Sequence, residues 1–127
     1  YQLNKYVKLA GYKNKAYELM NAANLFILSS KYEGLPNVLI EAQYFGIPII
    51  SSDCPSGPKE ILINGKAGVT FKTGNYFDLN NKIKFFIKNK NLFYKKTRFA
   101  KKNLYRFANK TIQEKYYKIL IKHFNSE

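Results

Sequence analysis

Short apolar segments that alternate with helix-like segments constrain this chain more than any other feature. The run Leu25-Phe-Ile-Leu28 is continuously apolar and ends at a pair of serines. A run of that length and character is typical of a parallel strand that is buried on both faces. Three other segments also have strand character, namely Tyr6 to Ala10, Pro48 to Ser51 and Gly68 to Phe71.

The segments between these strands have helix character. They are Lys13 to Ala23, about Asn37 to Phe45, Lys59 to Ile63 and about Tyr76 to Lys88, with Asn75 as the N-cap of the last. Asn is favoured at an N-cap because its side-chain oxygen accepts a backbone N–H of the first turn. The alternation of strand and helix predicts an α/β fold with a Rossmann-like, doubly wound parallel sheet.

Strand character stops after about Asn89. Residues 91–108 and 111–124 are each predicted to form a helix, with Thr111 and Glu114 as a capping box at the start of the second one. We therefore divide the chain into a partial Rossmann-like domain over residues 1–90 and a carboxyl-terminal helical extension over residues 91–127.

Composition narrows the class of protein. The chain has 127 residues, which suits one small domain, and Cys54 is its single cysteine, which excludes an internal disulfide and a cysteine-rich metal site. No membrane-spanning run and no signal-peptide pattern is present, so we expect a reduced, cytoplasmic protein. The net charge of +14 favours contact with anionic lipid or nucleic acid, although drift toward Lys, Asn, Ile, Tyr and Phe explains it equally well.

The connection after the Leu25 strand holds the strongest candidate site. Glu33 and Glu41 flank a Gly-Leu-Pro turn and the start of a helix. The free N–H groups and the dipole of a helix start favour a phosphate, and a carboxylate accepts hydrogen bonds from vicinal sugar hydroxyls. Ligands of open α/β sheets bind at the carboxyl ends of the strands, where this connection begins. The segment therefore predicts a nucleotide-sugar site.

The same residues resemble a known family. The run from Phe26 to Ala42 is similar to the Glu-x7-Glu motif of retaining glycosyltransferases of the GT-B fold, family 4 (group 1), in their carboxyl-terminal donor-binding domain. The stretch from Gly46 to Ile61 extends the similarity, which covers about residues 6–90. It looks like the branch that builds bacterial surface polysaccharides, lipopolysaccharide and lipid-linked oligosaccharides. The resemblance implies transfer of a sugar from a nucleotide-sugar, UDP-linked by that branch, to a glycan or lipid-linked glycan with retention.

The resemblance also implies roles for single carboxylates. Glu33 matches the first glutamate of the motif, which lies by the donor sugar and the reaction centre, so it is the candidate catalytic residue. Glu41 matches the second glutamate, which binds the ribose hydroxyls of the donor. Glu60 is left open between a donor contact and a structural role at the turn from Pro55 to Pro58.

Two further sets of donor-binding residues follow from the resemblance. The turn whose backbone contacts the donor sugar and diphosphate is matched by Gly34, Leu35, Pro36, Asn37, Val38 and Leu39. The loop that lies against the nucleobase is matched by Tyr12 and Lys13, just after the first predicted strand.

The family pattern also sets expectations for cofactors and partners. The sequence has no Asp-x-Asp motif, so we expect no cofactor and no essential metal, with helix N–H groups stabilising the leaving diphosphate. The amino-terminal, acceptor-binding lobe of the family is missing here, as is the segment that supplies an Arg and a Lys to the diphosphate. We therefore expect a hexosyltransferase-type enzyme of which this chain is the donor-binding part, with the missing lobe as its partner.

Two other hypotheses stay open. The missing lobe motivates a non-catalytic, truncated remnant that acts as a binding or partner module. Nucleic-acid binding through the net charge is the other hypothesis, but the basic residues are spread widely and form no recognised reader motif, so no nucleic-acid partner is expected. Peripheral contact with an anionic membrane, at the inner face of the cytoplasmic membrane, would suit a lipid-linked acceptor.

Overall fold

A three-stranded parallel sheet forms the centre of the molecule. The computed structural model describes residues 3–124, without the side chains of residues 116, 117 and 119–124. Strands β1 (Phe26–Leu28), β2 (Ile49–Ser52) and β3 (Val69–Phe71) pair in parallel in the order β1-β2-β3. The predicted α/β fold with a Rossmann-like parallel sheet is confirmed, with three of its four predicted strands.

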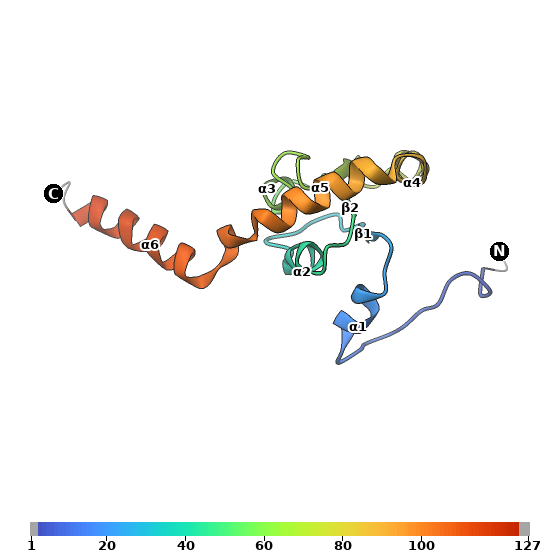
Figure 1. The fold of residues 1–127 in the computed structure, drawn as a ribbon, viewed down its shortest axis with the longest axis horizontal. Coiled ribbons are helices and arrows are strands. Elements are labelled where there is room, and N and C mark those ends of the chain that lie inside the picture. The colour runs from blue at the N-terminus through green and yellow to red at the C-terminus, as the bar shows by residue number, and fades with distance from the viewer. Residues whose placement is uncertain (1–2, 125–127) are drawn as a thin grey trace.

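The helices lie between the strands and continue beyond them. They are α1 (Ala16–Asn21), α2 (Asn37–Phe45), α3 (Pro58–Ile61), α4 (Tyr76–Lys88), α5 (Lys90–Lys102), the 3₁₀ helix η1 (Leu104–Phe107) and α6 (Asn109–Phe124). Asn75 caps α4 as predicted, because its side-chain oxygen accepts the Asp78 backbone N–H at 3.0 Å. Figure 1 shows α6 extending away from the sheet at one end of the molecule.

Two apolar clusters cover the two faces of the sheet. Neighbouring residues of β2 point to opposite clusters, since Ile49 packs in the cluster with α2 and α3 and Ile50 packs in the cluster with α4 and α5. A parallel sheet carries helices on both faces, and the central strand β2 is fully buried between them. The expected burial of the Leu25 to Leu28 strand on both faces is wrong, because β1 lies at the edge of the sheet, with Ile27 exposed and Phe26 and Leu28 only partly buried. Phe93 of α5 is buried in the second cluster, so α5 packs on the same core as the sheet. The division of the chain near residue 90 stays a prediction.

The predicted strand from Tyr6 to Ala10 is wrong. The Tyr6 and Val7 N–H groups donate to the Leu3 carbonyl in a turn, at 2.8 and 2.9 Å, and the following residues pair with no strand in the described part of the chain. A strand requires a neighbour that satisfies its backbone polar groups. β1 pairs with β2 on one side, and residues 6–10 do not reach its other edge, so their apolar side chains stay exposed.

The predicted helix over residues 91–108 is interrupted. α5 ends at Lys102, and the Asn103 side-chain amide donates to the Phe99 carbonyl at 2.8 Å. In a continuing α-helix, the backbone N–H of Asn103 would have made this hydrogen bond. The 3₁₀ helix η1 follows and is held against α3, because Arg106 Nη2 donates to the Ile61 carbonyl at 3.2 Å.

Two other predicted helix starts also differ from the structure. α6 begins at Asn109, so Thr111 lies inside the helix and the predicted capping box is wrong. The predicted helix from Lys13 to Ala23 is shorter in the structure, where it forms only α1. Met20 is the buried residue of α1, so little packing stabilises the ends of the longer predicted helix. Within the described residues, no helix combines the length and the apolar character needed to cross a membrane.

Candidate functional site

The connection from β1 to α2 carries both candidate carboxylates. It leaves the carboxyl end of β1, the sheet edge at which ligands of open α/β sheets bind. Glu33 is half-buried within this connection. Glu41 lies one turn after Asn37 on α2 and is exposed. The two carboxylates therefore lie on either side of the start of α2, as the sequence predicted.

α2 begins with backbone N–H groups that have no acceptor. Its N-cap residue, Pro36, has no N–H, and the Leu39 N–H bonds back to the Pro36 carbonyl at 2.9 Å. The Asn37 and Val38 N–H groups have no hydrogen-bond partner in the described part of the chain. Because the start of a helix carries partial positive charge, these two groups are available to an anion.

The predicted turn residues differ in what they can offer a ligand. Gly34, Leu35 and Asn37 are exposed, whereas Pro36 is buried. Leu39 is fully buried in the cluster on the α2 face of the sheet, and Val38 packs against that cluster. The side chain of Leu39 therefore packs in the core, and the exposed residues of the turn are Gly34, Leu35 and Asn37.

Hydroxyl groups from β2 and the loop after it support the β1–α2 connection. The Ser56 hydroxyl donates to the Glu33 carbonyl at 2.5 Å. The Ser52 hydroxyl donates to the Ser30 carbonyl at 2.7 Å. Both bonds satisfy backbone carbonyls that lie outside regular structure, so they hold the connection in one conformation.

Gly57 makes the closest approach to the same connection. Its φ is 83°, in the left-handed region, and its residue is buried. A β-carbon added there would collide with the Gly34 carbonyl oxygen and with Cδ of Pro36. Position 57 therefore requires glycine for two reasons, backbone conformation and space.

The sequence prediction did not include Ser52, Ser56 or Gly57 among the site residues. The sequence feature that could have pointed to Gly57 is its place directly before Pro58, because a Gly-Pro pair marks a turn with a restricted backbone. Glu60, considered for a structural role at this turn, is exposed, and its carboxylate forms no hydrogen bond within residues 3–124. The hydrogen bond that joins this turn to the β1–α2 connection comes from the Ser56 hydroxyl instead.

Asp53 is the ionisable group with a perturbed pKa beside this loop. It follows β2, and its Oδ1 accepts the Thr73 N–H at 2.7 Å and the Thr73 hydroxyl at 2.9 Å. These hydrogen bonds, the backbone one first, lower the pKa of the Asp53 carboxyl. Its charged form thereby joins the end of β2 to the loop after β3.

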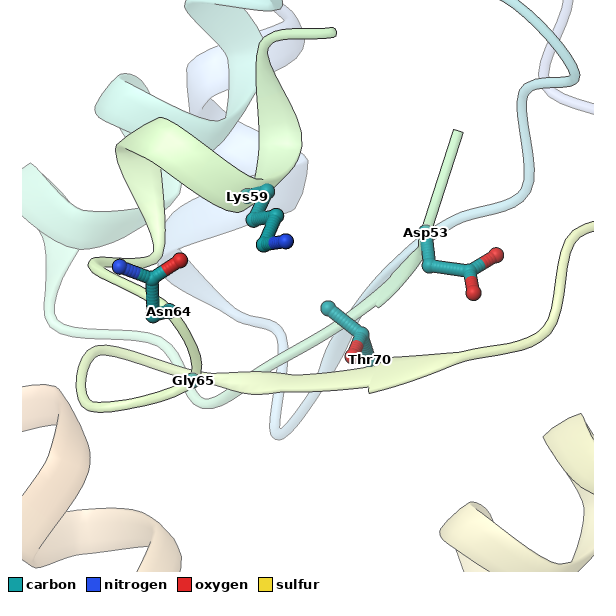
Figure 2. Close-up of a pocket in the computed structure, with 5 residues that line it drawn as sticks. All are labelled: Asp53, Lys59, Asn64, Gly65 and Thr70. Atoms are coloured by element: carbon teal, nitrogen blue, oxygen red, sulfur yellow. The ribbon is translucent and has the colours of Figure 1, made fainter. Parts of the chain in front are cut away.

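A polar hollow of about 360 Å³ lies next to Asp53, as Figure 2 shows. The other residues that line it come from α3, the following turn and β3, namely Lys59, Asn64, Gly65 and Thr70. The Lys59 side chain points into the hollow (Figure 2). None of the predicted site residues lines this hollow.

Glu41 lies beside an apolar hollow of about 450 Å³ between α2 and η1. The remaining lining residues are Ile40, Tyr44, Phe45, Leu104, Phe107 and Ala108. A single carboxylate beside aromatic and aliphatic side chains suits a ligand group that combines hydroxyls with apolar surface.

Tyr12 and Lys13 lie in the exposed segment that precedes α1. Figure 1 shows this segment running away from the sheet and from α2. Tyr12 is 91% exposed, and neither side chain forms a hydrogen bond or ion pair with the described residues. The structure does not bring them to the β1–α2 connection, and their nucleobase contact stays a prediction.

Comparison with known proteins decides the family. The family model for Glycosyl transferases group 1 matches residues 1–106. The chain belongs to this family. The match of the family model confirms the glycosyltransferase relationship that the motif predicted. The relatives with which this group 1 chain is compared are longer proteins.

Two curated relatives illustrate the match. A glycosyltransferase of Methanocaldococcus jannaschii is 43% identical over 60 residues, which are 47% of this chain and 15% of that protein. An N,N'-diacetylbacillosaminyl-diphospho-undecaprenol alpha-1,3-N-acetylgalactosaminyltransferase of Campylobacter jejuni is 29% identical over 113 residues, which are 89% of this chain and 30% of that protein. The group 1 chain thus spans less than a third of either relative.

Solved structures share the fold. Anabaena HepE in complex with UDP has a TM-score of 0.83 at 24% identity, over 94% of this chain and 33% of HepE. The carboxyl-terminal domain of a group 1 glycosyltransferase from Francisella tularensis has a TM-score of 0.64 at 18% identity, over 76% of this chain and 49% of that one. The fold of this chain is therefore that of a partial carboxyl-terminal lobe of a GT-B glycosyltransferase, as predicted.

Proposed function

We propose that this chain is the donor-binding part of a glycosyltransferase that uses a nucleotide-sugar, and specifically a UDP-sugar. The observation that carries the proposal is the β1–α2 connection, where Glu33, two N–H groups without acceptors and Glu41 follow the carboxyl end of the parallel strand β1. Family membership supports the reaction class. HepE, with the same fold, is a protein whose structure contains UDP, which supports uracil as the base of the donor.

Each part of the connection has a role in this proposal. The Asn37 and Val38 N–H groups face the donor diphosphate, and they stabilise the charge that grows on it as the bond to the anomeric carbon breaks. The Glu41 carboxylate accepts hydrogen bonds from the ribose hydroxyls. Glu33 lies by the donor sugar and the reaction centre, where its negative charge opposes the positive charge of an oxocarbenium-like transition state.

The acceptor side of the reaction belongs to the same proposal. The Campylobacter jejuni relative is named for a diphospho-undecaprenol-linked substrate, which supports a lipid-linked glycan as acceptor. We assign the chain to the retaining enzymes of family 4 and to hexosyl transfer, on the basis of the Glu-x7-Glu motif. An amino-terminal lobe would supply the acceptor site and the cations for the diphosphate.

Cofactor and location complete the proposal. No metal is required, because the start of α2 and cations of the other lobe balance the diphosphate charge. The enzyme works in the cytoplasm at the inner face of the cytoplasmic membrane, where a lipid-linked acceptor is reached. A non-catalytic binding module is the less favoured alternative, since the chain belongs to a family of transferases and both carboxylates of the motif are accessible.

Ligand-observed NMR of this chain with UDP, GDP and their sugars tests the proposal. We expect saturation of uridine and ribose protons in the unaltered chain and its loss in Glu41→Ala. Because Glu41 is exposed, the substitution leaves the fold intact. Glu114→Ala is the matched control, since Glu114 is an exposed carboxylate on α6, and it should bind as the unaltered chain does.

Two outcomes would count against the proposal. Equal binding by a folded Glu41→Ala variant would exclude the assigned ribose contact. Absence of any nucleotide binding by the folded chain would contradict an independent donor half-site and would favour the partner-module alternative.

A further inference from the structure

The basic residues are less widely spread than expected above, because positive charge is concentrated in one part of the chain. Residues 79–113 hold 11 of the 22 lysines and arginines and none of the eight acidic residues. The segment includes most of α4, all of α5 and the start of α6. Charge that is spread by composition alone would be interrupted by acidic residues, whereas here it forms one block with a fixed structure.

α5 presents part of this basic segment on the surface of the protein. Phe93, Thr97 and Ala100 are buried, so they define the side of α5 that packs on the core. At 100° per residue, the opposite side of the helix carries Lys95, Arg98 and Lys102, at spacings of three and four residues. All three are exposed. We call these three residues the basic ridge of α5.

The cations of the ridge have no anionic partner within the described residues. The ion pairs there join Lys15 to Glu18 and Lys82 to Asp78, and neither pair lies on α5. Lys96, beside the ridge, is turned toward the protein and donates to the Gly65 carbonyl. The ridge cations thus differ from Lys96 in facing solvent with their charge uncompensated.

Apolar side chains border the ridge. Leu92 and Phe99 follow one side and Tyr94 the other, and they are 40%, 38% and 44% exposed. A shallow hollow of about 340 Å³ lies on the ridge, and its lining combines Phe99 with the three cations. Lysine and arginine bind lipid phosphates, while tyrosine, phenylalanine and leucine gain by entering the headgroup region.

We propose that the basic ridge of α5, with Leu92, Tyr94 and Phe99, docks the protein on an anionic lipid surface. The combination of cations and exposed apolar carbon favours lipid over nucleic acid, because a nucleic-acid backbone would match the charge alone. The proposal deepens the proposed function by naming the face that holds the transferase near a lipid-linked acceptor. The lipid contact itself rests on the charge and shape of α5, and not on donor binding.

Vesicle flotation of the full chain tests the docking surface. The vesicles are pure phosphatidylcholine or phosphatidylcholine with about a third phosphatidylglycerol, at about 0.05 and 0.15 M salt, where screening differs. We expect binding to the anionic vesicles alone. The triple variant Lys95→Gln, Arg98→Gln, Lys102→Gln should lower the partition by at least about tenfold.

The control variant removes the same number of positive charges as the first triple variant, but at positions outside α5. Lys5, Lys8 and Lys66 are exposed and lie outside α5, so their triple change to Gln should lower the partition by less than about threefold. The double variant Leu92→Ser, Phe99→Ser should weaken binding at the higher salt most, where apolar contact contributes a larger share.

The following results would overturn the proposal. Equal losses in the two triple variants would mean attraction by net charge without a docking face. Absence of binding to anionic vesicles by the folded chain would also overturn it. Tighter binding to a short duplex DNA at equal salt, unaffected by the double variant, would assign the ridge to nucleic acid instead. UDP binding is measured on the same samples, so that lipid binding and donor binding are tested separately. Glu41→Ala should leave the flotation of the chain unchanged.

Discussion

The Ser56 hydroxyl and the Glu33 carbonyl are joined by a hydrogen bond of 2.5 Å between residues 23 positions apart in the sequence. The bond links the loop after β2 to the loop after β1. Because Leu28 and Ser51 are register partners in the sheet, the two loops leave it side by side. The Glu33 loop, which carries the proposed catalytic residue, is therefore held in place by the loop that follows the neighbouring strand β2.

Ser56→Ala should loosen the β1–α2 connection. Loss of one hydrogen bond lowers the free energy of unfolding by about 0.5–1.5 kcal/mol. Lower backbone order parameters at Gly34 and Leu35 should accompany it, measured by NMR relaxation. Ser29→Ala, at an exposed serine without a hydrogen bond to the described residues, is the control. An order parameter at Gly34 that is unchanged in Ser56→Ala would show that the bond does not order the loop.

Gly57→Ala should be more damaging than a change at a comparable glycine. Gly57 and Gly74 both have φ in the left-handed region, at 83° and 76°, but a β-carbon at Gly74 meets no atom within 4 Å. Both variants carry backbone strain of about 1 kcal/mol, and Gly57→Ala adds about 1–3 kcal/mol for displacement of the Glu33 loop. Urea unfolding measures the difference, and equal stabilities of the two variants would contradict the close approach.

Asp53→Asn should reduce stability at neutral pH and matter little in acid. The folded-state pKa of Asp53 is depressed, so its contribution is present above the unfolded value of 3.8 and disappears as the pH falls through the lower folded value. Melting temperatures at pH 7 and near pH 3 measure this effect. The gap between the variant and the unaltered chain should narrow toward the lower pH, and a gap independent of pH would exclude the charge as its cause.

Phe93→Ala should unfold the core and not only the carboxyl-terminal helices. Phe93 is 1% exposed and packs edge-on against Phe86 at a ring-centroid distance of 5.0 Å. Removal of a buried phenylalanine side chain costs about 3–5 kcal/mol. Phe77→Ala, at a residue that is 65% exposed, should cost far less. The two variants are compared by urea denaturation monitored by circular dichroism, and similar midpoints would argue that α5 is dispensable to the core.

Local patterns were enough to predict much of the fold. The apolar run ending at Leu28 became β1, and the caps at Asn75 and Gly46 bound α4 and α2 as expected. These features depend on residues close in sequence, such as an N-cap side chain or a glycine in the left-handed region after a helix. The candidate carboxylates were placed at the carboxyl end of β1 for the same reason.

These failed predictions depend on contacts that strand and helix propensity do not reveal. Tyr6 to Ala10 has the composition of a strand, but strand formation requires a second strand whose backbone is in reach. The break after Lys102 follows from the Asn103 amide and from the contact between Arg106 and Ile61, which helix propensity does not reveal.

The sequence by itself determined the order of strands and helices from residue 25 to residue 88 and the position of Glu33 and Glu41 around a helix start, because both are encoded by neighbouring residues. Only the tertiary structure decided that Ser56 and Gly57 hold the Glu33 loop, and that α5 buries Phe93 while it presents Lys95, Arg98 and Lys102 to solvent. Those relationships arise when β1 and β2 pair in parallel and the helices cover the sheet, since pairing and packing join residues that the sequence keeps apart.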